Sequence, residues 1–163
     1  MTPPRFAAFA ALYAGQQPAL WAYLVRTGAA AALAEDLAQE AFIKWLDHAQ
    51  APEDPGAAKA FLFTTATRLL IDRWRRERRY VAWDDSTPAN TTAPPADGLL
   101  SSGPWTALTP RERQLLWLAH AEEFTHAEIA QVTGLAPASV KVLLSRARQR
   151  LKARLMPTEQ PDD

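Results

Sequence analysis

The chain has 163 residues, with 18 basic and 18 acidic side chains that leave no net charge. A hydrophobic fraction of 48% and a charged fraction of 22% are typical of a globular protein and exclude a chain disordered throughout. Without cysteine there is no disulfide framework, thiolate metal site or thiol nucleophile. No apolar run approaches the roughly 20 residues that cross a bilayer. The alanine-rich N-terminus is interpreted as a helix, not a signal peptide, so we expect a cytoplasmic protein without membrane insertion.

Four helices are predicted before residue 80, because apolar residues recur at helical spacing. The third spans about residues 33–48 and the fourth about 57–79, with a proline-containing loop at 49–56 between them. The third helix has a polar outer face that includes Asp36, Gln39 and Glu40. The apolar stripes are, in order, Phe6, Phe9, Ala10 and Tyr13; Leu20, Trp21, Leu24 and Val25; Leu37, Ala41, Phe42, Trp45 and Leu46; and Phe61, Leu62, Thr65, Leu69 and Trp74.

The end of the fourth helix is rich in arginine. Its six arginines stand against only Asp72 and Glu77, a local net charge of +4. The planar guanidinium of arginine can donate two hydrogen bonds to one phosphate, and unpaired bases can stack on nearby aromatic rings. A nucleic-acid contact is therefore expected. The alternative is that the arginines only cap a helix C-terminus, and for Trp74 a place in the core is the better interpretation. The arginines are Arg68, Arg73, Arg75, Arg76, Arg78 and Arg79.

A linker composition follows in residues 81–104. This segment has four prolines, three aspartates, and neither lysine nor arginine. Its 24 residues would reach about 80 Å if fully extended. Residues 157–163 are predicted to form a frayed acidic tail.

Residues 108–155 have the pattern of a helix-turn-helix. Thr109 with Glu112 and Thr125 with Glu128 each form a capping box, Gly134 suits a left-handed helix end, and Pro137 suits the next first turn. The last helix places one apolar stripe inward: Val140, Leu143, Leu144, Ala147, Leu151 and Leu155.

The outer face of this last helix is cationic. Residues 141–154 contain six basic residues and no acidic one, which favours a bound polyanion. A short helix, a glycine turn and a longer cationic helix are typical of the motif that enters the DNA major groove. The alternative is a three-helix bundle with a solvated basic face. The residues expected outside are Ser139, Lys141, Val142, Ser145, Arg146 and Gln149.

Several of these segments resemble bacterial sigma factors. Residues 36–45 and 61–76 resemble the signatures of sigma domain two, and residues 108–113, 128–130 and 139–148 resemble sigma domain four. The two signatures occur in the right order, and no third domain fits between them. This layout is similar to the extracytoplasmic-function (ECF) class.

The resemblance implies an all-α fold of two small helical domains joined by a flexible acidic linker. The first, residues 1–80, would be a four-helix domain two. The linker at 81–104 would thread through polymerase, and 105–156 would be the helix-turn-helix domain four, before the tail at 157–163.

The resemblance also implies partners and roles for particular residues. The partners would be core RNA polymerase, promoter DNA and an anti-sigma factor wedged between the domains, with Leu115, Leu116 and Leu118 building the part that meets the polymerase flap. Polymerase docking would fall to Asp36, Gln39 and Glu40. The −10 contacts would be Lys59, Arg68, Arg73, Arg75, Arg76 and Arg79, with the 49–56 loop helping to melt DNA and hold a flipped base. The −35 contacts would be Ser139, Lys141, Val142, Ser145, Arg146 and Arg148.

The chain departs from the family pattern in three places, and these departures bear on the promoter sequence and not on the class. Arg68 stands where asparagine is usual, and Val142 with Leu143 replaces a common Ser-Arg or Thr-Arg pair, which shifts base reading toward thymine methyls, Lys141 and Arg146. Ala136 stands where a serine N-cap is usual, at a cost of about 1 kcal/mol to the helix start.

Three other classes of function fit the sequence less well than a sigma factor does. The sequence gives no support to an enzyme, because its three histidines lack ligand spacing and Asp84-Asp85 falls in the linker; no catalytic residue, metal or cofactor is predicted. A conventional helix-turn-helix regulator would explain the C-terminal third, but not the arginine cluster or the acidic helix. An interaction protein that titrates a regulator of sigma activity is the third possibility.

Overall fold

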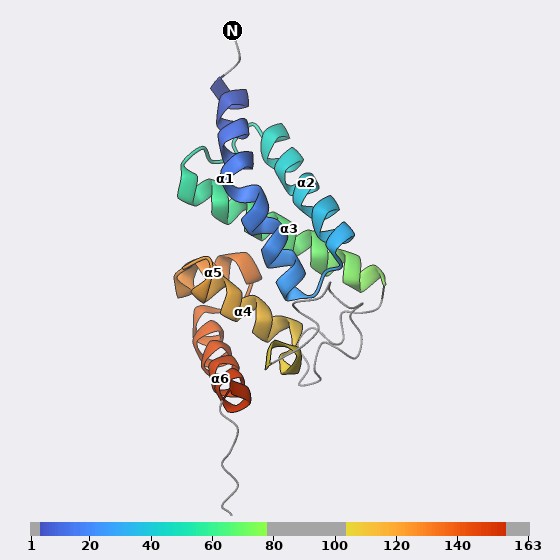
Figure 1. Cartoon of the computed structure of the whole chain (residues 1–163). Helices are drawn as coiled ribbons and strands as arrows, with labels where there is room; N and C mark the ends of the chain where they lie inside the picture. The colour runs from blue at the N-terminus through green and yellow to red at the C-terminus, as the bar shows by residue number, and fades with distance from the viewer. Residues whose placement is uncertain (1–3, 78–103, 156–163) are drawn as a thin grey trace, which may run out of the picture.

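The computed structural model describes residues 4–77 and 104–155, and within these ranges every regular element is a helix (Figure 1). The predicted all-α class is therefore confirmed. The helices are α1 (Pro4–Thr27), α2 (Ala31–Asp47), α3 (Pro55–Arg76), the short 3-10 helix η4 (Pro104–Ala107), α4 (Pro110–His120), α5 (His126–Thr133) and α6 (Pro137–Leu155). None of these described helices is long and apolar enough to span a membrane. The expected linker and tail fall almost wholly outside the described residues.

The first half contains three helices where the sequence predicted four. The first two expected helices are one continuous helix, α1, which has Pro18 in its interior. A proline removes the hydrogen bond to the carbonyl four residues earlier, that of Ala14. Both residues are exposed, so water can satisfy that carbonyl, while Phe9 and Leu20 pack inward on either side of the proline.

Helices α1, α2 and α3 enclose the first part of the core. Trp45 and Phe42 of α2 are almost fully buried, and Phe9 of α1 has its ring centroid 6.4 Å from that of Trp45. Of the first predicted stripe, Phe6 and Tyr13 remain exposed. Gly28 makes the turn into α2 with φ of 131°, and a side chain there would meet the Trp74 ring at 3.4 Å. The positive φ, a conformation that residues with a side chain rarely adopt, is what favours glycine at position 28.

The second half has the caps that the sequence predicted. Both capping boxes are formed, with Glu112 N donating to Thr109 Oγ1 and Glu128 N to Thr125 Oγ1, each at 3.2 Å. Gly134 ends α5 in the left-handed conformation with φ of 78°. One inward prediction is wrong, since Leu155 is 61% exposed. It lies at the last residue of α6, where only one side of the helix is covered.

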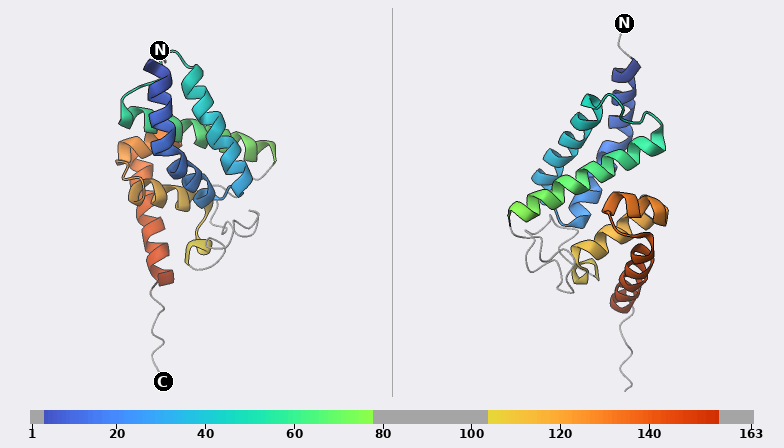
Figure 2. Two further views of the ribbon diagram at one scale, coloured as in Figure 1. Left: turned by 45° about the horizontal axis from the view of Figure 1, so that its top comes forward. Right: turned by 180° about the vertical axis from the view of Figure 1, so that it is seen from behind.

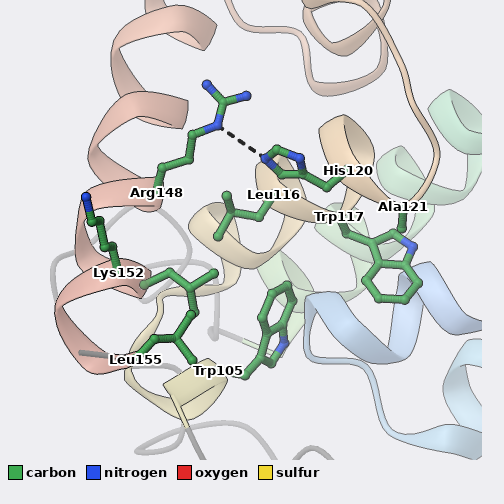
Figure 3. Close-up of a pocket in the computed structure, with 9 residues that line it drawn as sticks. Trp105, Leu116, Trp117, His120, Ala121, Arg148, Lys152 and Leu155 are labelled. Carbon is green, nitrogen blue, oxygen red and sulfur yellow. Dashed lines mark hydrogen bonds between the residues drawn. The ribbon is translucent and has the colours of Figure 1, made fainter. Parts of the chain in front are cut away.

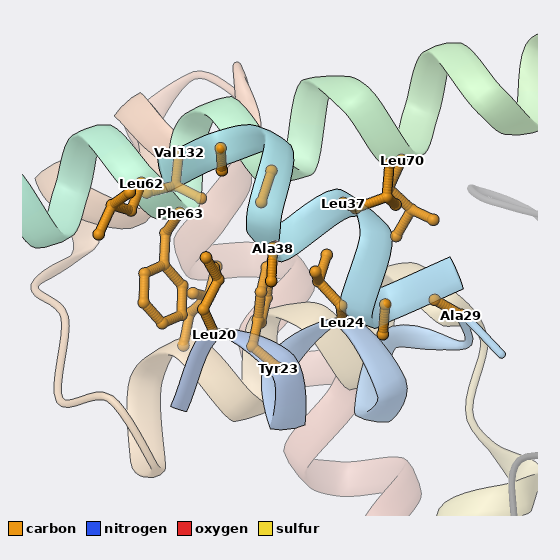
Figure 4. Packing of buried hydrophobic residues seen from close by; sticks show 14 of the residues in the cluster. Leu20, Tyr23, Leu24, Ala29, Leu37, Ala38, Leu62, Phe63, Leu70 and Val132 are labelled. Carbon is orange, nitrogen blue, oxygen red and sulfur yellow. The ribbon is translucent and has the colours of Figure 1, made fainter. Parts of the chain in front are cut away.

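The two halves of the chain pack on each other. Helix α5 lies against α3, and α4 lies against α1, as Figure 1 and the view from behind in Figure 2 both show. The buried cluster runs from one half into the other, so that Val132 of α5 belongs to the same core as Leu62 and Phe63 of α3 (Figure 4). The described residues of the two halves therefore share one buried core.

Candidate polymerase and nucleic-acid interfaces

The acidic face of α2 is formed as the sequence predicted. Asp36, Gln39 and Glu40 are all exposed, because the opposite face of the helix is buried through Leu37 and Ala41. Next to this face lies an exposed apolar side chain, Ile43, which the sequence reasoning left out. Carboxylates around one apolar residue suit a basic protein surface with a small apolar contact.

The loop between α2 and α3 is held from both sides. From inside, Trp45 Nε1 donates to Pro52 O at 2.8 Å. From outside, the Arg5 guanidinium donates to the carbonyls of Trp45 at 2.6 Å, Leu46 at 3.2 Å and His48 at 2.5 Å. Sequence reasoning missed Arg5, because its partners lie about 40 residues away.

Helix α3 starts directly after this loop. Asp54 caps it by accepting from Ala57 N at 3.1 Å, with Pro55 in the first turn. The loop is thus held by hydrogen bonds at both of its ends.

A groove of about 660 Å³ lies between α2 and α3, beside this loop. It combines an aromatic wall, Phe61 with the His48 ring 6.0 Å away, with charged groups of both signs. A planar base could stack on such a wall and hydrogen-bond to its rim. The lining residues are Lys44, Asp47, His48, Phe61, Thr65, Arg68, Leu69 and Asp72.

The structure spreads the arginines of α3 over an exposed surface. Arg68, Arg73, Arg75 and Arg76 are exposed, while Arg79 lies outside the described residues. Arg73 pairs with Glu77 at 2.9 Å on the surface, where such a pair contributes little and can be exchanged for phosphate. Trp74 is only 5% exposed, which confirms its core interpretation and removes it as a stacking partner for a base.

Lys59 is not on the open surface with those arginines. Its Nζ lies 2.8 Å from Glu122 Oε2, in the contact between the two halves of the chain. The same ammonium lies 5.1 Å from the centre of the Phe124 ring. In this arrangement the Lys59 ammonium is already paired with a carboxylate.

The cationic face of α6 points outward. Ser139, Lys141, Val142, Ser145 and Arg146 are all exposed, and Val142 at 50% is an apolar side chain presented to solvent. Arg148 lies apart from this group, on the edge facing α4, where its Nε is 3.2 Å from His120 Nε2. Five of the six predicted −35 residues thus share a free surface.

An apolar groove lies between α4 and the end of α6, with a volume of about 540 Å³ (Figure 3). Its floor is mostly apolar and its rim carries Arg148, Lys152 and His120. Leu155 is exposed and lines this groove, so its apolar side chain forms part of the groove wall and not of the core. The lining is Trp105, Leu116, Trp117, His120, Ala121, Arg148, Leu151, Lys152 and Leu155.

Within residues 4–77 and 104–155, no three His, Asp or Glu side chains lie close enough together to ligate a metal ion. Leu115, Leu116 and Leu118 are buried in the core of the second half, and Leu116 also lines the groove between α4 and α6.

Comparisons with known proteins identify the family. Residues 12–80 match the family Sigma-70 region 2, and residues 106–151 match Sigma-70, region 4. The ECF RNA polymerase sigma factor SigL of Mycobacterium tuberculosis (strain ATCC 25618 / H37Rv) is 32% identical over 155 residues, covering 89% of this chain and 87% of that protein. SigM of Bacillus subtilis (strain 168) is 32% identical over 129 residues, covering 74% and 78%.

A solved structure has a similar fold. It is the sigma factor RpoE from Bartonella quintana, in complex with the anti-sigma factor NepR, with a TM-score of 0.65, 26% identity, and coverage of 88% of this chain and 92% of that chain. The two matched regions, the ECF relatives and the shared fold all lead to one family. The chain belongs to the extracytoplasmic-function class of bacterial RNA polymerase sigma factors, which direct promoter-specific transcription initiation.

Proposed function

We propose that the faces described above divide the work of a sigma factor along the chain. Residues 1–80 act as domain two, which docks on core polymerase and takes the −10 element. Residues 81–104 link it to domain four, residues 105–156, which reads the −35 element, and 157–163 form a tail. The outward cationic face of α6, in a helix-turn-helix with both capping boxes formed, is the observation that carries this proposal.

Polymerase docking is assigned to Asp36, Gln39 and Glu40. Their side chains are exposed on one rigid helix, so they can meet a basic polar surface without rearrangement. Ile43 beside them supplies an apolar contact.

The −10 element is assigned to the loop before α3, the groove beside it and the arginines of α3. Melting requires bases to leave the stack, at a cost of a few kcal/mol each. Phosphate contacts from Arg68, Arg73, Arg75 and Arg76 offset this cost and make it dependent on salt. The groove at Phe61 and His48 is the proposed place for an extruded base.

The −35 element is assigned to α6. Lys141 and Arg146 can donate to guanine edges or phosphate, and Val142 can contact a thymine methyl group. Ser139 and Ser145 add short hydrogen-bonding groups on the same face. Arg148 lies at the edge of α6 that faces α4, where its Nε donates to His120 Nε2. It therefore suits a phosphate contact better than a contact to a base.

Further partners follow from the groove between α4 and α6. Its apolar floor and cationic rim suit an acidic amphipathic segment, such as the polymerase flap would offer. An anti-sigma factor is also a proposed partner, supported by the similar RpoE fold, which was solved with one. We assign no catalytic residue and no cofactor, and place the protein in the cytoplasm.

Binding to core polymerase without DNA tests the proposal against a conventional helix-turn-helix regulator. Asp36→Arg should reduce co-purification with core polymerase at least tenfold, because it places a cation on the docking face. Glu123→Arg is the matched control, since it makes the same charge reversal at an exposed site on the other half. Absence of the wild-type protein from the polymerase complex would support the conventional regulator, and equal binding of both variants would remove the docking assignment.

A further inference from the structure

The groove between α4 and α6 differs in charge from the groove between α2 and α3. Asp47 and Asp72 line the α2–α3 groove, whereas none of the nine residues that line the α4–α6 groove is acidic. The charged residues of the α4–α6 groove are Arg148 and Lys152, with His120 bonded to Arg148 at 3.2 Å. A rim of one sign of charge attracts an anion.

The apolar part of this groove has well-fixed walls. The rings of Trp105 and Trp117 lie at 78° to each other with their centroids 6.5 Å apart, and Trp105 Nε1 donates to Arg26 O at 3.2 Å. Leu151 and Leu155 form the wall on the α6 side. Because Leu155 is 61% exposed, a ligand that covered it would remove apolar surface from water.

The charged and the apolar residues gather at different ends of the groove. Figure 3 shows Arg148 and His120 at one end, and Trp105 and Leu155 at the other. Arg148 and Lys152 are four residues apart on α6, so their side chains are neighbours and can both reach one anionic group. From Arg148 to Leu155 the helix rises about 10 Å. The groove therefore suits a molecule with one anionic head and an apolar tail.

The size of the groove also suits a small molecule. Its volume of about 540 Å³ falls within the range of roughly 300–1,000 Å³ that is typical of ligand pockets. A compact aromatic acid held at Arg148 would leave the far wall at Leu155 uncovered. A flexible alkyl chain can follow the wall to its end.

We propose that the groove between α4 and α6 binds a free long-chain carboxylate, that is, a fatty acid. The carboxylate lies at Arg148 and Lys152, and the alkyl chain lies along Trp105 and Leu155. The effect on transcription rests on the proposed function, because the same groove is assigned there to an acidic amphipathic segment of polymerase. A bound fatty acid covers the apolar floor and competes with that segment, so the affinity for polymerase depends on the concentration of free fatty acid.

Calorimetric titration of the free protein with octanoate, decanoate and dodecanoate tests the binding, with each acid below its micelle-forming concentration. Affinity should rise about fourfold for each methylene that the apolar wall covers. Dodecanol, which has the same chain length without the charge, should bind more weakly than dodecanoate. Equal affinity for the three acids, or no binding of any of them, would overturn the proposal.

Three variants test the orientation of the ligand. Lys152→Gln should weaken dodecanoate binding about twofold to fivefold, because it removes one exposed charge, and should leave dodecanol binding unchanged. Arg154→Gln is the matched control, since Arg154 is exposed near the end of the same helix and does not line the groove. Leu155→Gln should reduce the gain in affinity from decanoate to dodecanoate. Equal effects of Lys152→Gln and Arg154→Gln on dodecanoate would contradict the assigned carboxylate position.

Nuclear magnetic resonance locates the bound ligand. Dodecanoate should shift the indole N–H signals of Trp105 and Trp117, assigned from Trp105→Phe and Trp117→Phe, and leave that of Trp45 in the core of the first half unmoved. A shift at Trp45 alone would overturn the site. Two other occupants would also overturn the proposal: a membrane, if only phosphatidylglycerol vesicles bound, and a second copy of the chain, if dilution alone shifted the Trp105 and Trp117 signals.

Competition is measured separately, by co-purification with core polymerase. Dodecanoate at about ten times its dissociation constant should reduce the amount of wild-type protein that co-purifies several-fold, and octanoate at the same concentration should have little effect. Binding of dodecanoate without this reduction would overturn the competition. The titration uses free protein and needs neither polymerase nor promoter, so failure of the sigma-factor assignment remains distinguishable from failure of the fatty-acid site.

Discussion

At the scale of single residues, Arg146 is the sharpest test of DNA reading. It is exposed on the outward face of α6 and lies away from the groove edge where Arg148 bonds to His120. Arg146→Ala should cost about 1–3 kcal/mol of discrimination at the base pair it contacts, measured by transcription from promoters substituted through the −35 element. Arg154→Ala, an exposed arginine near the end of the same helix, is the control. If Arg146→Ala weakened polymerase binding to the same degree, its role would be structural.

Tyr23 gives a residue-scale prediction on pH. Burial raises the pKa of Tyr23 above its ordinary value of 10.0, although hydrogen bonds with Thr67 and Gln114 oppose this shift. Above about pH 10 the unfolded phenol therefore ionises while the folded one stays protonated, so the stability it contributes is present below pH 10 and is lost at higher pH. Urea unfolding at about pH 8 and about pH 10.5 should show a steeper loss for the wild type than for Tyr23→Phe. Parallel losses would contradict the burial of this phenol.

At the scale of elements, Arg5 stabilises the C-terminal end of α2. Its guanidinium donates to the carbonyls of Trp45 and Leu46 at the end of the helix and to that of the C-cap residue His48. Arg5→Ala should lower the free energy of unfolding by about 1–2 kcal/mol, and Arg5→Lys, which keeps the charge without the fork, should lose less. Denaturant unfolding measures both. Equal stability of all three proteins would show that the loop does not depend on this contact.

The elements were largely predictable where their signals are local. The two capping boxes and Gly134 act within four residues, and each is found in the structure as predicted. The two apolar stripes predicted two helices where α1 is continuous, because the hydrogen bond lost at Pro18 faces water and packing continues on both sides of the proline. Helical spacing also placed Leu155 in the core, because spacing alone does not tell where the neighbouring helix ends.

At the scale of the whole molecule, the sequence could not give the contact between the halves. Lys59 and Glu122 are 63 residues apart, and Tyr23 and Gln114 are 91 apart. Periodicity and composition give the exposed face of a helix but not its distant partner, so Lys59 was grouped with the DNA-binding arginines. The outward residues of α2 and α6 were predicted well for a different reason. Once periodicity gives the buried face of a helix, the exposed face follows from it.

The central claim is that this chain selects promoters for RNA polymerase. The most direct test mixes the purified protein with bacterial core RNA polymerase and a library of promoter fragments, and sequences the 5′ ends of the run-off RNA. We predict that the starts share one −10 and −35 pair, and that Arg146→Ala relaxes the −35 element alone. Absence of specific starts, with the protein missing from the polymerase complex, would contradict the account.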